Sequence, residues 1–283
     1  MRLKNTLQNI ASQNTLNLIE ATTLSGGDIN EVLLLKCVKG SFVVKLNSAS
    51  KFPGMFTAEA KGLDLLNNSK SFRIPKVVAT GVIKEASYLL MEYIPTGSPK
   101  PDFWEIFAQN LVTLHKTTQN SFGLDHDNYI GSLPQQNTYC QTASEFYISE
   151  RLEPQFRMAS DNEFQFKNLE KFYKNIAEKI PNEPPALIHG DLWNGNFMVS
   201  EDGNPVLIDP AVAFAPREMD LAMMKLFGGF NSSTFEIYDS FFPLKSGWKN
   251  RIDLWQLYYL LVHLNLFGSG YLGQVQSIVS KHT

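Results

Sequence analysis

His-Gly-Asp-Leu-Trp-Asn-Gly-Asn at residues 189–196 and Ile-Asp-Pro at residues 208–210 are the most informative stretches of this chain. They contain an aspartate, an asparagine and a second aspartate in the order that a phosphoryl-transfer centre uses. Such a centre needs in-line positioning, a group that accepts the proton of the attacking hydroxyl, and metal ions that neutralise phosphate oxygens. We predict Asp191 as that base, and Asn196 and Asp209 as ligands of Mg²⁺, which prefers hard oxygen atoms.

The residues between these stretches predict how the two metal ligands meet. Short apolar runs occupy 197–199 and 206–208, and the segment 200–205 is rich in turn-forming residues. This pattern is typical of a β-hairpin, whose antiparallel pairing would bring Asn196 and Asp209 together at its open end. The alternative is a buried His-Gly-Asp turn with a strand-end aspartate. Three oxygen-bearing side chains at one hairpin mouth favour the catalytic interpretation.

Composition excludes several classes of protein. The chain has 283 residues, a net charge of −3 and 43% hydrophobic residues, which is enough for one large domain or two lobes. Lysine and arginine are dispersed, so we expect the protein to bind neither nucleic acid nor an anionic membrane. Two cysteines are too few for a disulfide framework or a zinc site. Without a signal-like start or a membrane-length apolar run, we expect a soluble cytoplasmic protein.

The amino-terminal part alternates apolar residues as β-strands do, with helical exceptions. We predict a helix at 1–22 with Leu7, Ile10, Leu16 and Ile19 on its buried side. The elements predicted after it are strands at 32–35 and 42–46, a helix at 55–67, and strands at 76–83 and 88–93.

A proline-rich segment at 95–101, Pro-Thr-Gly-Ser-Pro-Lys-Pro, divides the chain. After it the pattern is mainly helical, apart from the hairpin. We therefore predict a bilobal α+β fold: a nucleotide-binding lobe at 1–94 with an antiparallel sheet and one key helix, a connector at 95–101, and a mainly α-helical catalytic and substrate lobe at 102–283. Ligands bind well in a cleft between such lobes.

Lys45 and Glu59 are candidates for holding a nucleotide. A lysine on the third strand that pairs with a helix glutamate holds the α- and β-phosphates of ATP in kinases. Lys45 lies on the predicted 42–46 strand, and Glu59 shares the side of its helix that carries Ala60 and Leu63. The alternatives are a solvent-facing edge lysine and a solvated surface glutamate.

Two further segments could contact the nucleotide. Gly26 and Gly27 precede the first predicted strand, where glycines let backbone amides approach phosphates closely. Glu92, Tyr93 and Ile94 lie between the last strand and the connector, where backbone groups could bind the adenine edge. An ordinary turn and an ordinary strand end are the corresponding structural alternatives.

With these residues identified, the chain resembles the fructosamine/ketosamine 3-kinases, which have the protein-kinase-like fold of aminoglycoside phosphotransferases. The resemblance covers nearly the whole chain. Its more specific features are Trp193 within the His-Gly-Asp stretch and Asp-Pro-Ala at 209–211, where protein kinases carry Asp-Phe-Gly. It implies that ATP and Mg²⁺ are used, and that Lys45, Glu59 and the backbone of 92–94 hold ATP.

The resemblance also implies the substrate. The family phosphorylates O3 of ketosamines, the sugar–amine adducts of glycation. A phosphate at O3 is a leaving group next to a carbonyl-bearing carbon, so elimination can release the free amine. The implied biology is deglycation, with a glycated-protein lysine or a small ketosamine as the partner.

The composition of the carboxy-terminal tail indicates which class of acceptor the protein would bind. From Arg251 onward Asp253 is the only acidic residue, which suits a sugar better than a polycation. We predict Trp193 as a platform for the sugar or amine, with His263 and Asn265 near the pocket. A further candidate, Glu218, could face the acceptor amine, or it could cap a helix with Asp220.

Two alternatives stay open. One is a kinase of another hydroxylated amine, such as an aminoglycoside-like or choline-like acceptor. The other is a catalytically silent nucleotide-binding scaffold, which would require a missing catalytic part. All the predicted parts are present: Lys45, Glu59, Asp191, Asn196 and Asp209.

Overall fold

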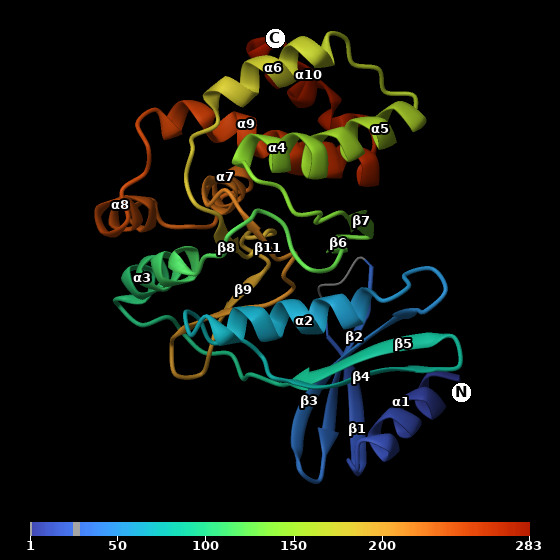
Figure 1. The fold of residues 1–283 in the computed structure, drawn as a ribbon. Helices are drawn as coiled ribbons and strands as arrows, with labels where there is room; N and C mark the ends of the chain where they lie inside the picture. The colour runs from blue at the N-terminus through green and yellow to red at the C-terminus, as the bar shows by residue number, and fades with distance from the viewer. Residues whose placement is uncertain (1, 25–28) are drawn as a thin grey trace.

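The computed structural model describes residues 2–24 and 29–283. An antiparallel sheet occupies the amino-terminal part and helices dominate the rest, so the chain forms two lobes, as the α+β prediction requires (Figure 1). The strands of the sheet lie in the order β1-β2-β3-β5-β4. Their bounds are β1 (Leu18–Thr23), β2 (Glu31–Cys37), β3 (Gly40–Ser48), β4 (Val77–Ile83) and β5 (Ala86–Glu92).

The predicted helix at 1–22 is too long. Helix α1 (Arg2–Gln13) ends early, and the chain then forms edge strand β1, which pairs antiparallel with β2. Leu7, Ile10 and Leu16 are buried as predicted, whereas Ile19 is 70% exposed. Strand β1 contains three β-branched residues, Ile19, Thr22 and Thr23, which favour a strand, and its backbone pairs with β2. The periodicity of residues within the segment does not reveal that partner.

Helix α2 (Met55–Asn68) lies between the sheet and the helical lobe (Figure 1). Phe56, Leu63 and Leu66 pack with Leu89 of β5 on one side and Leu207 of the helical lobe on the other. Helix α1 covers the opposite face of the sheet. Because one helix contributes to the core of both lobes, the side chains of α2 are held at the junction between them.

The helical lobe is built around α9 (Trp248–Phe267), which buries nine of its 20 residues. It packs against α7, α5 and α10. The elements of this lobe are α3 (Phe103–Lys116), β6 (Asn128–Ile130), β7 (Leu133–Gln135), α4 (Ala143–Phe146), η1 (Tyr147–Leu152), α5 (Glu153–Asp161), α6 (Leu169–Lys179), β8 (Ala186–Ile188), β9 (Phe197–Val199), β10 (Pro205–Leu207), β11 (Ala213–Ala215), α7 (Glu218–Leu226), α8 (Ser232–Phe241), η2 (Ser269–Tyr271) and α10 (Leu272–His282).

The predicted hairpin is confirmed as strands β9 and β10, in which Phe197 pairs with Leu207. The proline-rich segment runs beside it: the Gly97 amide donates to the Val199 carbonyl at 3.1 Å, and the Glu201 amide donates to the Pro95 carbonyl at 2.8 Å. These bonds tie the segment between the lobes to the hairpin.

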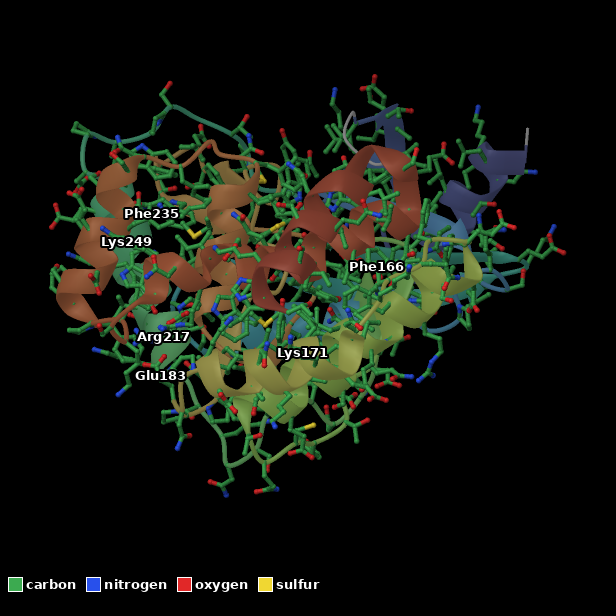
Figure 2. All side chains as sticks on the ribbon, turned by 90° about the horizontal axis from the view of Figure 1, so that it is seen from above. Phe166, Lys171, Glu183, Arg217, Phe235 and Lys249 are labelled. Carbon is green, nitrogen blue, oxygen red and sulfur yellow. The ribbon has the colours of Figure 1, made fainter. Side chains whose placement is uncertain are left out.

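An ion pair fixes the amino-terminal end of α7. Arg217 bonds Glu183 at 2.6 Å and donates to the backbone carbonyls of Phe242 and Pro243, each at 2.7 Å. Figure 2 shows Arg217 and Glu183 next to each other at the edge of the helical lobe. Helix α7 is thereby tied to the segments before β8 and after α8.

Both cysteines, Cys37 and Cys140, are buried and unpaired, as expected for small apolar residues or free thiols. Among the helices of the described residues, none combines the length and the apolar character that a membrane crossing requires.

Candidate active site

The loop that carries Asp191 is held by a buried carboxylate from α7. The backbone amides of His189 and Gly190 donate to the two oxygens of Asp220, at 2.8 and 2.9 Å. His115 Nε2 lies 3.2 Å from the same carboxylate. Since Asp220 is fully buried, these polar contacts compensate for its lost hydration and fix the backbone of the loop.

The His189 imidazole joins the two predicted stretches. Burial lowers its pKa, so the ring is neutral near pH 7. Its Nδ1 accepts from the Asp191 amide at 3.3 Å, so Nε2 carries the hydrogen and donates to the Ile208 carbonyl at 2.9 Å. The imidazole thus links the loop that carries Asp191 to the segment that precedes Asp209.

Gly190 lies where the two stretches approach most closely. Its φ is +82°, and a Cβ placed there would be 2.0 Å from the Ala211 carbonyl oxygen. The Ala211 amide in turn donates to the His189 carbonyl at 2.9 Å. Only glycine accommodates both the left-handed conformation and this contact.

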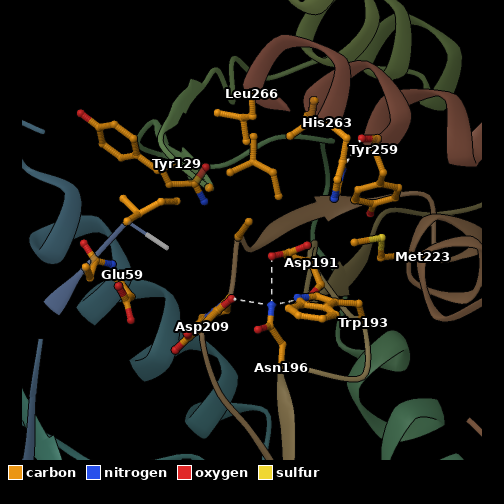
Figure 3. Close-up of a pocket in the computed structure, with 18 of the residues that line it drawn as sticks. Glu59, Tyr129, Asp191, Trp193, Asn196, Asp209, Met223, Tyr259, His263 and Leu266 are labelled. Atoms are coloured by element: carbon orange, nitrogen blue, oxygen red, sulfur yellow. Dashed lines mark hydrogen bonds between the residues drawn. The ribbon is translucent and has the colours of Figure 1, made fainter. Parts of the chain in front are cut away.

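Asn196 connects Asp191 with Asp209 (Figure 3). Its Nδ2 donates to the Asp191 carboxylate at 2.9 Å and to the Asp191 carbonyl at 2.8 Å, and it lies 3.4 Å from the Asp209 carbonyl. The hairpin therefore brings these three residues together as predicted. Burial raises the pKa of Asp191 to about 7, although the hydrogen bond from Asn196 opposes the shift.

Lys45 on β3 links the two lobes. Its Nζ lies 2.6 Å from Glu59 Oε1 on α2 and 2.5 Å from Asp209 Oδ1. Burial alone would lower the pKa of Lys45, but the charges of Asp209 and Glu59 outweigh it and raise the pKa, so the side chain stays cationic. The predicted pairing of Lys45 with Glu59 is present, and the position of Asp209 within the same contact is an addition.

A cavity of about 490 Å³ is lined by five of these residues: Lys45, Glu59, Asp191, Asn196 and Asp209. One end is formed by β3, α2 and the hairpin mouth, with Lys45, Glu59 and Asp209. The other end is formed by α7 and α9 above Asp191, with Met223 and His263 (Figure 3). The site lies at the junction of the two lobes, where the sequence analysis placed it.

Two further nucleotide contacts were predicted, at Gly26 and Gly27 and at residues 92–94. Gly26 and Gly27 lie outside the described residues. The Glu92 amide donates to the Lys76 carbonyl at 2.8 Å, and its carboxylate bonds Arg73 at 3.1 Å. The segment 92–94 does not line the cavity around Asp191, so an adenine contact there stays a prediction.

Trp193 lies on the wall of the cavity and is 39% exposed. A Cβ on Gly195 would be 2.4 Å from the indole, so glycine at that position leaves room for the ring beside the loop. The Phe227 ring lies 6.4 Å from the Trp193 ring between centroids, and the His263 ring lies 4.9 Å from the Phe227 ring. This wall of the cavity is aromatic.

The prediction that Glu218 faces the acceptor is wrong. Its carboxylate accepts from Arg251 at 2.6 and 2.9 Å and from Trp255 Nε1 at 2.7 Å, and it does not line the cavity. Glu218 begins α7, and there its side chain turns into the lobe. A buried carboxylate needs such partners, and these two occupy both oxygens.

Asn265 is the second wrong placement. Its Nδ2 donates to the Gln155 carbonyl at 3.0 Å and to Gln155 Oε1 at 2.8 Å, away from the cavity. His263 does line the cavity. Residues two apart on a helix point to different sides, so His263 and Asn265 could not both face it.

Sequence reasoning missed the role of Asp220 in holding the loop. An aspartate inside the apolar run Met-Asp-Leu-Ala-Met-Met was a usable signal, because a buried aspartate must be paired. It also missed Asn128 and Gln135, whose amides donate to the Val212 carbonyl at 2.8 Å and the Ala211 carbonyl at 3.3 Å. These two side chains support the segment after Asp209.

The comparisons with known proteins agree with this geometry. The family model described as fructosamine kinase matches residues 2–283. A probable ketoamine kinase of Enterococcus faecium is 39% identical over 263 residues, which cover 90% of this chain and 92% of that protein.

Solved structures support the same relationship. A crystal structure of a protein assigned as a fructosamine-3-kinase, from Haemophilus somnus, has a TM-score of 0.88 at 27% identity and covers 97% of this chain and 95% of that one. The aminoglycoside phosphotransferase APH(4)-Ia, solved with AMP-PNP and hygromycin B, has a TM-score of 0.65 at 14% identity, covers 97% of this chain and 98% of that one, and shares the fold alone. The protein is therefore a phosphotransferase with a protein-kinase-like fold, and the chain belongs to the fructosamine kinase family.

Proposed function

We propose that this protein transfers the γ-phosphoryl group of ATP, with Mg²⁺, to O3 of a ketosamine. The observation that carries the proposal is the meeting of Asp191, Asn196, Asp209 and the Lys45–Glu59 pair around one cavity. Family membership points to the ketosamine as acceptor. In this assignment 1–94 is the nucleotide-binding lobe, 95–101 the connector and 102–283 the catalytic and substrate lobe.

Asp191 has the environment of a catalytic base. Transfer forms a bond between O3 and the γ-phosphorus, breaks the bond to the β–γ bridging oxygen, and releases ADP. The O3 proton passes to Asp191, whose carboxylate is oriented by Asn196. A carboxylate with a pKa raised by burial accepts a proton more readily than an ordinary aspartate.

The donor set at the hairpin mouth fits Mg²⁺. The Asn196 amide nitrogen is engaged by Asp191 and Asp209, which leaves its Oδ1 as the free ligand atom. Asp209 contributes a carboxylate next to it. Mg²⁺ takes one or two protein oxygens together with phosphate and water, and when bound it neutralises phosphate charge. Among the described residues no cluster of three or more His, Cys, Asp or Glu side chains offers a competing metal site.

Lys45 is positioned to bind the phosphates. It lies between two carboxylates, Glu59 and Asp209, at the end of the cavity opposite His263. With the metal on Asp209, the lysine would keep Glu59 as its partner and direct its remaining hydrogens to the α- and β-phosphates. The AMP-PNP complex of APH(4)-Ia supports nucleotide use on this fold. We propose that Gly26, Gly27 and the backbone of 92–94 complete the nucleotide site.

The acceptor half suits a sugar–amine adduct better than a polycation. Of the carboxylates that line the cavity, Glu59 and Asp209 are paired with Lys45, and Asp191 is the base. A polycationic aminoglycoside would find no further carboxylate among the described lining residues. Trp193 instead offers an aromatic face, which binds a sugar or the amine substituent.

The product explains the proposed role in the cell. Phosphate leaves C3 by elimination next to the carbonyl-bearing carbon, and water then hydrolyses the remaining sugar–amine imine and releases the amine. We propose a cytoplasmic deglycation enzyme acting on small ketosamines or on glycated lysines of proteins.

The test is an acceptor panel. The purified protein is given Mg-ATP with ribulosamine, erythrulosamine, fructosamine, choline or an aminoglycoside, and ³¹P NMR locates the transferred phosphate. Transfer to O3 of one or more ketosamines is the expected result. Transfer only to choline or the aminoglycoside would refute the ketosamine assignment, and transfer to none of the five would favour a silent scaffold.

A further inference from the structure

The Tyr259 hydroxyl is a buried polar group without a partner. The residue is 1% exposed, and its Oη has no hydrogen-bond partner within residues 2–24 and 29–283. Leaving a buried hydroxyl unpaired costs about 1–3 kcal/mol, so such a group in a folded protein calls for an explanation. Tyr259 lines the cavity that contains Asp191, and a bound ligand is therefore the natural partner.

The neighbouring tyrosine shows that the helical lobe can provide a hydrogen-bond partner for a buried tyrosine hydroxyl. Tyr258, also on α9, donates its hydroxyl to Gln135 Oε1 at 2.6 Å. The two rings pack edge to face at 5.1 Å between centroids, but the two hydroxyls have different surroundings. The Tyr258 hydroxyl bonds within the protein, whereas the Tyr259 hydroxyl is buried without a partner among the described residues, on a residue that lines the cavity.

The position of Tyr259 assigns it to the acceptor end. Figure 3 shows Tyr259 and His263 next to each other on α9, above Asp191 and Met223. Lys45 and Glu59 line the opposite end of the cavity. A group bound to Tyr259 would thus belong to the molecule whose hydroxyl reaches Asp191, and not to the nucleotide.

Tyr259 and His263 offer complementary hydrogen-bonding atoms. Burial is the main cause that raises the pKa of Tyr259 well above its usual range, so its hydroxyl stays protonated and can donate. His263 Nδ1 donates to the Tyr259 carbonyl at 2.8 Å, and burial lowers the pKa of this ring, which leaves Nε2 as an acceptor. A ligand at this end meets a donor beside an acceptor.

We propose that the Tyr259 hydroxyl donates a hydrogen bond to the oxygen on C2 of the acceptor, the carbon next to the one phosphorylated. This inference rests on the proposed function, since a ketosamine carries its keto or hemiketal oxygen at C2. Holding that oxygen would orient O3 toward Asp191. Tyr259 is in this role a specificity-determining residue that touches the substrate.

The test combines one conservative variant with two acceptors. Tyr259→Phe removes the hydroxyl and keeps the ring, and the 2-deoxy analogue of the preferred ketosamine removes the proposed partner. With the ketosamine, we expect kcat/KM of Tyr259→Phe to fall at least about 10-fold, the loss that a deleted hydrogen bond to an uncharged group produces. With the 2-deoxy analogue, wild type and variant should have equal kcat/KM.

Tyr258→Phe is the matched control. It removes a hydroxyl that has a protein partner, so its Tm should fall by about 2–4 °C per kcal/mol lost. Tyr259→Phe removes an unpaired hydroxyl, so its Tm should stay constant or rise. The change in Tm without ligand therefore distinguishes a hydroxyl that binds a ligand, as proposed for Tyr259, from one that stabilises the fold, as in Tyr258.

The outcomes distinguish this inference from the proposed function. If wild type phosphorylates ketosamines and Tyr259→Phe retains full kcat/KM, only the role of Tyr259 is overturned. An equal loss on both acceptors would likewise overturn it, because the hydroxyl would then not bind the C2 oxygen. If wild type transfers phosphate to no ketosamine, the proposed function fails and this inference fails with it.

Discussion

The loop that carries Asp191 and the aromatic wall of the cavity are built in different ways. The backbone around Asp191 is fixed by hydrogen bonds to buried groups, among them Asp220, His189 and Asn196. The aromatic wall consists of the rings of Trp193, of Phe227 directly after α7, and of Tyr259 and His263 on α9, and Trp193 is partly exposed there. The loop therefore depends on many mutually dependent contacts, whereas we expect the wall to accept other residues at small cost to the fold.

The largest expected effect comes from the proposed base, Asp191. Asp191→Asn should lower kcat by at least about 10²-fold, because the amide cannot accept the hydroxyl proton. ATP should still bind, which a thermal shift with Mg-ATP would show. Turnover near that of wild type would remove Asp191 from the role of base.

Two glycines of the 189–196 stretch compare the Asp191 loop with the aromatic wall as a matched pair. In Gly190→Ala the new Cβ would lie 2.0 Å from the Ala211 carbonyl, so backbone must move against backbone. In Gly195→Ala the new Cβ would lie 2.4 Å from the indole of Trp193, a side chain that can swing outward. We expect Gly190→Ala to lose several kcal/mol of unfolding free energy and most activity, and Gly195→Ala to remain folded with a raised KM for the acceptor.

Urea unfolding and steady-state kinetics on both glycine variants measure this difference. Equal destabilisation by the two substitutions would contradict the view that the aromatic wall is more adaptable than the Asp191 loop.

Two buried carboxylates of α7 give a second matched pair. Asp220→Asn weakens the bonds to the His189 and Gly190 amides and should lower both Tm and kcat. Glu218→Gln weakens the ion pair with Arg251, outside the cavity, and should lower Tm while kcat changes little. Unfolding and initial rates, measured on the same preparations, test the pair. A larger loss of kcat in Glu218→Gln would reverse our assignment of the two residues.

The smallest effect is expected at the acceptor wall. Trp193→Phe keeps an aromatic face but reduces its area, so kcat/KM for the ketosamine should fall about 2- to 10-fold with unchanged Tm. The KM for ATP serves as the internal control and should stay constant. A large rise in the KM for ATP would place Trp193 on the nucleotide side instead.

The local parts of the site could be predicted from sequence. Two apolar runs around a turn were sufficient for the hairpin, because the open end of an antiparallel hairpin brings its flanking residues together whatever surrounds it. Lys45 and Glu59 were predictable from the order of strand and helix. Edge strand β1 was not predicted, since its stability depends on pairing with β2 and not on its own periodicity.

Residue types and their spacing indicate which side chains could accept a proton, hold a metal ion or pair with a phosphate. Which side of a helix faces the cavity depends on packing between segments that are far apart in the chain. In the folded chain Glu218 bonds Arg251, Asn265 bonds Gln155, and Asp220 holds the loop that carries Asp191. Tyr259 lines the cavity, and its hydroxyl has no partner among the described residues. A buried polar side chain takes the partner that packing brings to it, and that partner is distant in the sequence.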